Sequence, residues 1–289
     1  MNTTLVVLAA GLGSRYGGFK QLDAMGPNAH SIMDYSLFDA LHIGFTSVVL
    51  VVQESMVAPL TERYITNRNW PVTFAIQNTN ITIGDNKYYR EKPWGTAHAL
   101  WCAKDAVNTP FVLINADDFY GRESFRLAFN YLQTQSDCCA VLFPIDKTLS
   151  SNGVVNRAEA TIDNGWLQTT VEREKISRQE GKIVYSTIEG GEKELPERTL
   201  VSMNMWGLTP EIFGFIDNDI SEFIENWKQN ANLEYQLPSV IDRMIQHRLM
   251  EVKAIPTQSH WVGVTYKTDK EMVKMQLQQL HNTGIYDDL

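Results

Sequence analysis

The chain has no run of about 18 apolar residues, which is the length that a membrane-spanning helix needs. No basic segment precedes the first apolar run, residues 5–8, so we expect no signal peptide, no membrane partner and a cytoplasmic protein. The three cysteines are odd in number and lack the spacing of a metal site. We therefore expect reduced thiols rather than disulfides or zinc ligands.

Positive charge is also scarce. The chain has 25 Lys and Arg against 34 Asp and Glu, which gives a formal net charge of -9. Surfaces that bind nucleic acid gather Lys and Arg, so this balance argues against a nucleic-acid partner. A local cationic pocket is still compatible with an acidic chain, and the sequence leaves a homo-oligomer open.

In the first half of the chain, apolar runs alternate with helical patterns. This alternation predicts βαβ units and an α/β fold, with a three-layer, Rossmann-like, mostly parallel sheet flanked by helices. The predicted strands are residues 5–9, 47–52, 72–76, 111–115 and 140–144, and the predicted helices are residues 32–43, 95–106 and 124–135.

From about Asn152 the pattern changes to short β-prone segments, which indicate a small antiparallel substrate subdomain. The predicted strands there are residues 158–162, 167–171, 182–188, 200–208 and 251–255; residues 189–198 are predicted to be a loop, and residues 237–247 and 270–281 helices. Because no linker interrupts the chain, we expect one domain, 1–289, with two halves, 1–150 and 151–289.

A glycine-rich turn, LAAGLGSRYGGFKQL (residues 8–22), follows the first strand. Glycines let backbone N–H groups face an anion, and Arg15 and Lys20 can neutralise its charge. The dinucleotide pattern G-x-G-x-x-G fails because its third glycine position holds Tyr16, and the P-loop pattern fails because Phe19 separates the lysine from the preceding glycine. Taken alone, the turn could also be a tight connection without a ligand.

Asp117 and Asp118 follow the predicted strand 111–115. Ligands of open α/β sheets bind at the carboxyl ends of the strands, where both this pair and the glycine-rich turn would lie. Adjacent carboxylates facing phosphates predict Mg²⁺. The alternative is that one aspartate caps the next turn and the other faces solvent.

The string A-A-G-x-G-x-R, with a lysine a few residues on, resembles the signature of the nucleotidyltransferases that make sugar nucleotides, such as glucose-1-phosphate thymidylyl- and uridylyltransferases. The resemblance implies their fold, which is similar to that of glycosyltransferases of the A type. It also implies that Arg15 and Lys20 contact the phosphates of a nucleoside triphosphate. Further nucleotide contacts would come from the strand end and the turn: Leu8, Ala9, Ala10, Gly11 and Gly13.

Two further strings extend the resemblance. NADDFYG resembles the family's metal-binding strand end, which makes Asp117 the catalytic aspartate that binds Mg²⁺ and Asp118 a supporting metal or substrate ligand. In EKPWGTAHAL, Gly95 and Thr96 would approach the base and ribose of the nucleotide. The alternative is that they only mark the start of a helix, where such residues are common. Arg90 stands where the family often has a base-reading glutamine.

The acceptor side is matched more loosely. TVEREKI resembles a strand in which Glu172 would bind sugar hydroxyls and Lys175, with Arg173 as a rival, the sugar phosphate; a solvated strand edge is the alternative. MNMWG resembles the strand that lines the sugar pocket, so Asn204 is a candidate for hydroxyl contacts. Trp206 would form a stacking wall or belong to the core.

One position departs from the family. HWVGVT has Gly263 where the family commonly carries the aspartate that is the second magnesium ligand. Asp118 or Asp269 would then complete the metal shell, or one carboxylate would suffice together with phosphates and water.

We therefore expect a Mg²⁺-dependent nucleotidyltransferase that joins a nucleoside triphosphate to a sugar 1-phosphate and releases pyrophosphate. Residues 1–150 would form its nucleotide-binding half and residues 151–289 its acceptor-binding half. A phosphorylated non-sugar alcohol such as phosphocholine is an alternative acceptor. A nucleotide-binding regulatory protein without turnover is an alternative from another class, suggested by Gly263. A nucleotide-cofactor oxidoreductase is disfavoured by Tyr16.

Overall fold

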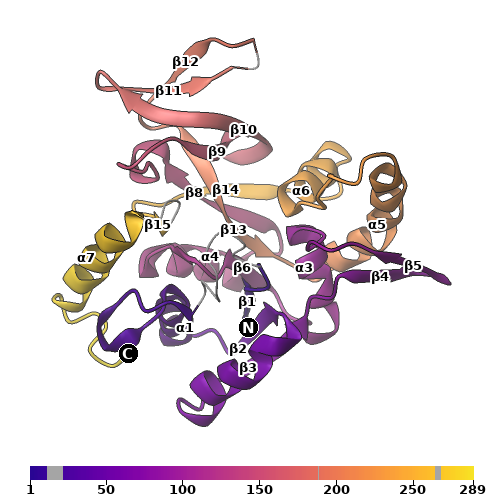
Figure 1. Cartoon of the computed structure of the whole chain (residues 1–289), viewed down its shortest axis with the longest axis horizontal. Coiled ribbons are helices and arrows are strands. Elements are labelled where there is room, and N and C mark those ends of the chain that lie inside the picture. The colour runs from indigo at the N-terminus through magenta and orange to yellow at the C-terminus, as the bar shows by residue number, and fades with distance from the viewer. Residues whose placement is uncertain (12–21, 188, 264–267) are drawn as a thin grey trace.

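The computed structural model describes residues 1–11, 22–187, 189–263 and 268–289. It is built on an 11-stranded sheet (Figure 1): ten strands follow the order β12-β11-β10-β14-β8-β13-β6-β1-β2-β3, and β9 lies off this path. The parallel strands in the first part of the chain are β1 (Thr4–Leu8), β2 (Ser47–Val52), β3 (Val72–Ile76) and β6 (Phe111–Asn115). They run parallel to one another, with β1 between β2 and β6, so their carboxyl ends meet at one edge.

Helices cover both faces of this part of the sheet. Leu5 and Val7 of β1 face the cluster that contains α1 and α4, while Val6 faces the cluster that contains α3, α5 and α6. A strand that is buried on both faces reads as a continuous apolar run, which explains the pattern of residues 5–8. The helices are α1 (Ile32–Ile43), α2 (Val57–Leu60), α3 (Thr96–Cys102), α4 (Arg122–Thr134), α5 (Glu211–Gln229), α6 (Leu237–Gln246) and α7 (Asp269–His281).

The rest of the sheet has mainly antiparallel pairs. Its strands are β8 (Cys138–Pro144), β9 (Val155–Asp163), β10 (Trp166–Gln179), β11 (Lys182–Ser186), β12 (Glu192–Leu195), β13 (Leu200–Leu208) and β14 (Val252–Pro256). β9 pairs with both β10 and β13, and these pairings close a ring through β14 and β8. The α/β prediction is confirmed, but "mostly parallel" describes only the first half. The whole sheet is mixed because β13 inserts antiparallel between β6 and β8.

Two short pairs complete the strands. β4 (Asn80–Ile83) and β5 (Asn86–Tyr89) form a hairpin that projects from the body of the molecule (Figure 1). β7 (Asp118–Phe119) pairs with β15 (Val262–Gly263), next to α7. No helix in the described ranges is long and apolar enough to cross a membrane.

Most predicted elements are present, several with the expected bounds, but two expectations fail. The predicted loop at residues 189–198 contains β12, which pairs with β11. Its charged sequence, EKEL, lacks the apolar pattern that would have predicted a strand. The predicted helix 95–106 leaves its α-helical path after Cys102 and ends in a 3-10 turn, Lys104–Ala106. The sequence interpretation also missed α5 and the β4–β5 hairpin.

Candidate functional site

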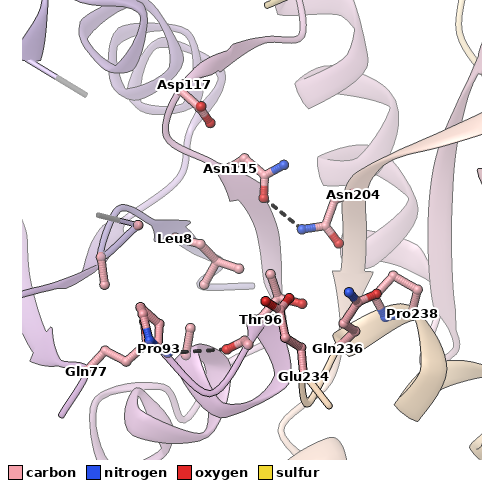
Figure 2. A pocket seen from close by; sticks show the side chains of 14 residues that line it. Leu8, Gln77, Pro93, Thr96, Asn115, Asp117, Asn204, Glu234, Gln236 and Pro238 are labelled. Atoms are coloured by element: carbon pink, nitrogen blue, oxygen red, sulfur yellow. Dashed lines mark hydrogen bonds between the residues drawn. The ribbon is translucent and has the colours of Figure 1, made fainter. Parts of the chain in front are cut away.

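A cavity of about 500 Å³ opens at the carboxyl ends of β1 and β6 (Figure 2). It brings together seven of the residues predicted from the sequence: Leu8, Ala10, Gly11, Gly95, Thr96, Asp117 and Asn204. The β1–β6 register places Leu8 beside Asn115, which also lines the cavity. Figure 2 shows Asp117 on one side of the cavity and Gln77 and Pro93 on the other.

The segment that leads into the glycine-rich turn is held firmly at this cavity. Ala9 is buried, and its N–H donates to the carbonyl of Val51 (2.8 Å). The amide of Gln53 donates to the carbonyl of Ala10 (2.9 Å). Ala9 therefore supports the strand end instead of lining the cavity. Gly13, Arg15 and Lys20 lie outside the described residues.

Both the backbone conformation at position 95 and the atoms around it require glycine. Its φ is +126°, and a Cβ there would lie 2.4 Å from the carbonyl oxygen of Tyr235. That carbonyl accepts the N–H of Ala97 (2.9 Å), and the hydroxyl of Thr96 accepts the N–H of Leu237 (2.9 Å). These hydrogen bonds hold the start of α3 against the segment between α5 and α6. This close approach brings Glu234, Gln236 and Pro238 to the cavity wall, none of which the sequence interpretation identified.

Gln77, directly after β3, also lines the cavity and was not predicted. Its amide Nε2 donates to the carbonyl of Gly95 (3.2 Å) and to Nδ1 of His98 (3.3 Å). Burial lowers the pKa of His98 to about 4, so the ring is neutral at pH 7 and Nδ1 can accept. Both N–H groups of the Gln77 amide are therefore hydrogen-bonded within the protein, so Oε1 is the atom of this side chain that can accept a hydrogen bond from a ligand.

Arg90, predicted to contact the nucleotide, does not line the cavity. Its guanidinium donates to the carbonyl of Leu233 (2.8 Å) and lies 5.4 Å from the ring centre of Trp94. The prediction counted residues back along the chain from Gly95. In the structure the β4–β5 hairpin intervenes, and Gln77 takes the place beside Gly95.

The two aspartates differ in environment. Asp117 lines the cavity, whereas Asp118 is 9% exposed and accepts a hydrogen bond from Asn115 Nδ2 (2.9 Å). The hydroxyl of Tyr120 lies 3.3 Å from the same carboxylate oxygen. The structure therefore places Asp117 where a ligand would lie and Asp118 in a hydrogen-bonded position beside it.

Gly263 pairs with Asp118 in the β7–β15 ladder. A Cβ at this position would lie 2.3 Å from the ring of Trp261 and 2.9 Å from Oδ1 of Asp118. The place of the family's second aspartate is therefore taken by these two side chains. Asp269, the other candidate acid, is buried, accepts hydrogen bonds from Ser150 (3.0 Å) and Asn152 (2.7 Å), and does not line the main cavity.

Of the two candidates on β13 for contacts with the acceptor, one lines the cavity and the other is buried. Asn204 lines the cavity, whereas the side chain of Trp206 is fully buried and donates to Asn204 Oδ1 (2.8 Å). Trp206 is therefore a core residue, and the alternative of a stacking wall is wrong because no face of its ring is accessible.

Glu172 and Lys175 on β10 are exposed and do not line the cavity. Partial desolvation raises the pKa of Glu172, an effect that Arg157 opposes. Arg173, the rival cation, is paired with Glu159 (2.7 Å). The string TVEREKI, which resembles the family only loosely, therefore contributes no residue to the described lining of the cavity.

No protein-family model and no curated protein matches the sequence. Solved structures do match the fold. UTP-bound UGPase from Acinetobacter baumannii aligns with a TM-score of 0.62 and 15% identity over 99% of each chain. The inositol-1-phosphate CTP transferase from T. maritima aligns with a TM-score of 0.63 and 13% identity over 93% of this chain and 94% of that one.

A UDP-glucose pyrophosphorylase complexed with UDP-glucose aligns with a TM-score of 0.58 and 15% identity over 98% of this chain and all of that one. These identities are low, so the alignments show a shared fold, and the shared fold extends over almost the whole chain.

Proposed function

We propose that the protein is a nucleotidyltransferase. In the proposed reaction, an oxygen of a sugar 1-phosphate attacks the α-phosphorus of a nucleoside triphosphate, pyrophosphate leaves and a nucleotide sugar forms. The observation that carries this proposal is the meeting of four distant segments at one cavity: Gly11 at the start of the glycine-rich turn, Gly95 before α3, Asp117 after β6, and Asn204 of β13. These segments are the ones in which the sequence resembles the nucleotidyltransferases, and solved enzymes of that class share the fold.

Charge repulsion is the main obstacle to this reaction, since both substrates are anions. Two unit charges about 4 Å apart repel by about 4 kcal/mol at an effective dielectric constant near 20. We assign Arg15 and Lys20 to neutralise the triphosphate, and the cavity walls to hold the two substrates in line. A phosphate monoester oxygen is already ionised at neutral pH, so the attack needs no general base.

The acid end of the cavity suits Mg²⁺. This ion binds proteins through one or two carboxylates, completes its shell with substrate phosphates and water, and rarely uses an all-protein cage. Asp117 lines the cavity, and Asp118 follows it at the same strand end. Bound there, the ion would neutralise charge on the phosphates.

We assign the base to the opposite end, beside Gln77. Its Oε1 can only accept a hydrogen bond, so it suits a base that presents an N–H group. Uracil, thymine and guanine carry such a donor on a ring nitrogen.

The acceptor end favours a polyhydroxylated molecule. Glu234 and Gln236 offer carboxylate and amide groups that pair with hydroxyls. Quaternary ammonium groups are instead bound by cages of aromatic rings. None of the described residues that line the cavity is aromatic, and Trp206 is buried behind it. A sugar phosphate therefore fits this surface better than phosphocholine does.

The proposal is tested by measuring pyrophosphate release in the presence of Mg²⁺. UTP, dTTP, CTP and GTP are each crossed with a panel of sugar 1-phosphates, inositol 1-phosphate and phosphocholine. We expect release that requires both a triphosphate and a sugar 1-phosphate, and its loss in Asp117→Asn and Lys20→Ala. Triphosphate binding without release from any pair would support the regulatory alternative and overturn the enzyme proposal. Release with phosphocholine alone would overturn the assignment of the acceptor.

A further inference from the structure

A chain of side-chain hydrogen bonds crosses the sheet beneath the acceptor end of the cavity. Trp206 Nε1 donates to Asn204 Oδ1 (2.8 Å), and Asn204 Nδ2 donates to Asn115 Oδ1 (2.8 Å). Asn115 Nδ2 then donates to Asp118 Oδ2 (2.9 Å). Figure 2 shows the central bond, between Asn115 and Asn204, at the wall of the cavity. The chain links the buried core of β13 to the strand end that carries Asp117.

The direction of these bonds is fixed at both ends. An indole N–H can only donate, so the Asn204 atom that faces Trp206 must be its carbonyl oxygen. A carboxylate can only accept, so the Asn115 atom that faces Asp118 must be its amide nitrogen. Neither asparagine can therefore turn its amide over without breaking a bond. Such a fully directed chain is costly to disturb because a buried polar group that loses its partner is destabilising.

The backbone of Asn204 is also unusual. Its φ is +61°, within a nine-residue strand, and the pairing of β13 with β8 shifts register between Ser202 and Trp206. A β-bulge re-aims a side chain, and a left-handed non-glycine residue inside a strand is a strained conformation that is concentrated at functional sites. The strain here is what directs the Asn204 side chain into the cavity and onto Asn115.

Each amide nitrogen carries a second N–H. Within residues 1–11, 22–187, 189–263 and 268–289, no further acceptor takes the second N–H of Asn115 or Asn204. Both side chains line the cavity, and they lie within one hydrogen bond of each other. Two N–H donors with a forced orientation, beside the acid end of the cavity, make a small site for an anionic oxygen.

We propose that Asn115 and Asn204 bind a phosphate oxygen of the acceptor, and that Trp206 is the positioning residue that fixes the donors toward it. The assignment rests on the proposed function. It gives the acceptor phosphate a partner on the cavity wall, which Glu172, Arg173 and Lys175 do not provide. Asn204 lies on β13, whereas the glycine-rich turn follows β1 on the other side of β6, so the acceptor and not the nucleotide is the ligand assigned to the pair.

Two variants test whether these residues position the donors for the ligand or only pack the core. Asn204→Gly removes the amide and relieves the strain of the left-handed backbone, which offsets part of the cost of the lost hydrogen bonds. Trp206→Phe removes the N–H that orients Asn204 and keeps an aromatic ring in the core. Trp101→Phe is the matched control, because Trp101 donates its N–H to Asp217 on the outer surface (2.6 Å).

The readout is steady-state kinetics with UTP and the most active sugar 1-phosphate of the panel, with inorganic phosphate as a competitor. Hydrogen bonds to charged groups are individually strong, so we expect both variants to raise the acceptor KM about tenfold or more. Inhibition by inorganic phosphate should weaken in parallel, while the KM for UTP should stay within about twofold. Trp101→Phe should match the wild type.

A rise in the KM for UTP alone would overturn the assignment, because the pair would then hold the nucleotide. Unchanged KM values for both substrates would overturn it too, since the chain of bonds would then serve only the fold. Failure of the wild type to release pyrophosphate with any pair of substrates would instead refute the proposed function on which the assignment rests. The three results are distinct.

Discussion

Oδ1 of Asp118 lies 2.9 Å from the position that a Cβ on Gly263 would occupy. The two residues are register partners in the β7–β15 ladder, and the ring of Trp261 fills the rest of that space. One carboxylate therefore stands where the resemblance to sugar nucleotidyltransferases leads one to expect another. The absence of a side chain at position 263 leaves room for the carboxylate of Asp118.

This relationship predicts that Gly263→Asp does not improve the site. The new side chain would meet Trp261 and a second carboxylate, so we expect the free energy of unfolding to fall by about 1–3 kcal/mol, as for overpacked cores. Urea denaturation measures the change. Gly214→Asp is the control, because a Cβ at Gly214 meets nothing within 4 Å. A Gly263→Asp variant as stable as this control would contradict the packing account.

Gly95→Ala should impair nucleotide binding and stability together. The residue has φ of +126°, and its new methyl group would collide with the Tyr235 carbonyl. We expect a loss of about 1–3 kcal/mol in stability, the usual cost of a strained backbone position. Calorimetric titration with UTP should show weaker binding, because Gln77, whose amide donates to the Gly95 carbonyl, would shift. Undiminished affinity for UTP would show that the proposed base site beside Gln77 does not depend on Gly95.

His98 predicts a dependence of stability on pH. Burial lowers its pKa from 6.5 to about 4, so the unfolded chain binds a proton between these values and the folded chain does not. Stability from this residue is present above pH 6.5 and is lost as the pH falls toward 4, by about 1.4 kcal/mol per pH unit. Denaturation curves of His98→Leu and the wild type, compared at pH 7 and pH 5, measure the difference. A gap between the two proteins that does not change with pH would refute it, and His247→Gln serves as the surface control.

Asp117→Asn should abolish transfer while leaving the fold intact, because the side chain faces the cavity. Asp118→Asn should instead lower the free energy of unfolding by about 1–3 kcal/mol, since a carboxylate that accepts from Asn115 and Tyr120 is replaced by an amide. Thermal denaturation and pyrophosphate release, measured on both variants, separate the two roles. Equal loss of stability in both variants would contradict the different environments of the two aspartates.

The strength of local patterns explains which parts could be predicted. The strands at residues 47–52 and 111–115 are continuous apolar runs buried on both faces, so their bounds follow from hydrophobicity alone. Asp117 could be placed because it directly follows such a strand. The charged strand β12 has only Leu195 buried and depends on its pairing with β11, which no local pattern reveals.

The missed site residues depend on contacts between segments far apart in the chain. Gln77 meets Gly95 across an inserted hairpin, and Glu234 and Gln236 reach the cavity because Tyr235 packs on Gly95. Asn115 was part of a recognised string, but its role comes from Asn204, 89 positions along the chain. Such partners follow from topology, and the spacing of residues in the sequence does not encode them directly.

The central claim is that an acceptor phosphate oxygen attacks the α-phosphorus, and an isotope experiment tests it most directly. The active sugar 1-phosphate is labelled with ¹⁸O at its non-bridging oxygens and incubated with UTP, Mg²⁺ and the protein. Mass spectrometry then follows the label in the products. The account predicts a nucleotide sugar that retains all of the label and pyrophosphate that carries none. Release of UMP and pyrophosphate without a labelled nucleotide sugar would contradict it.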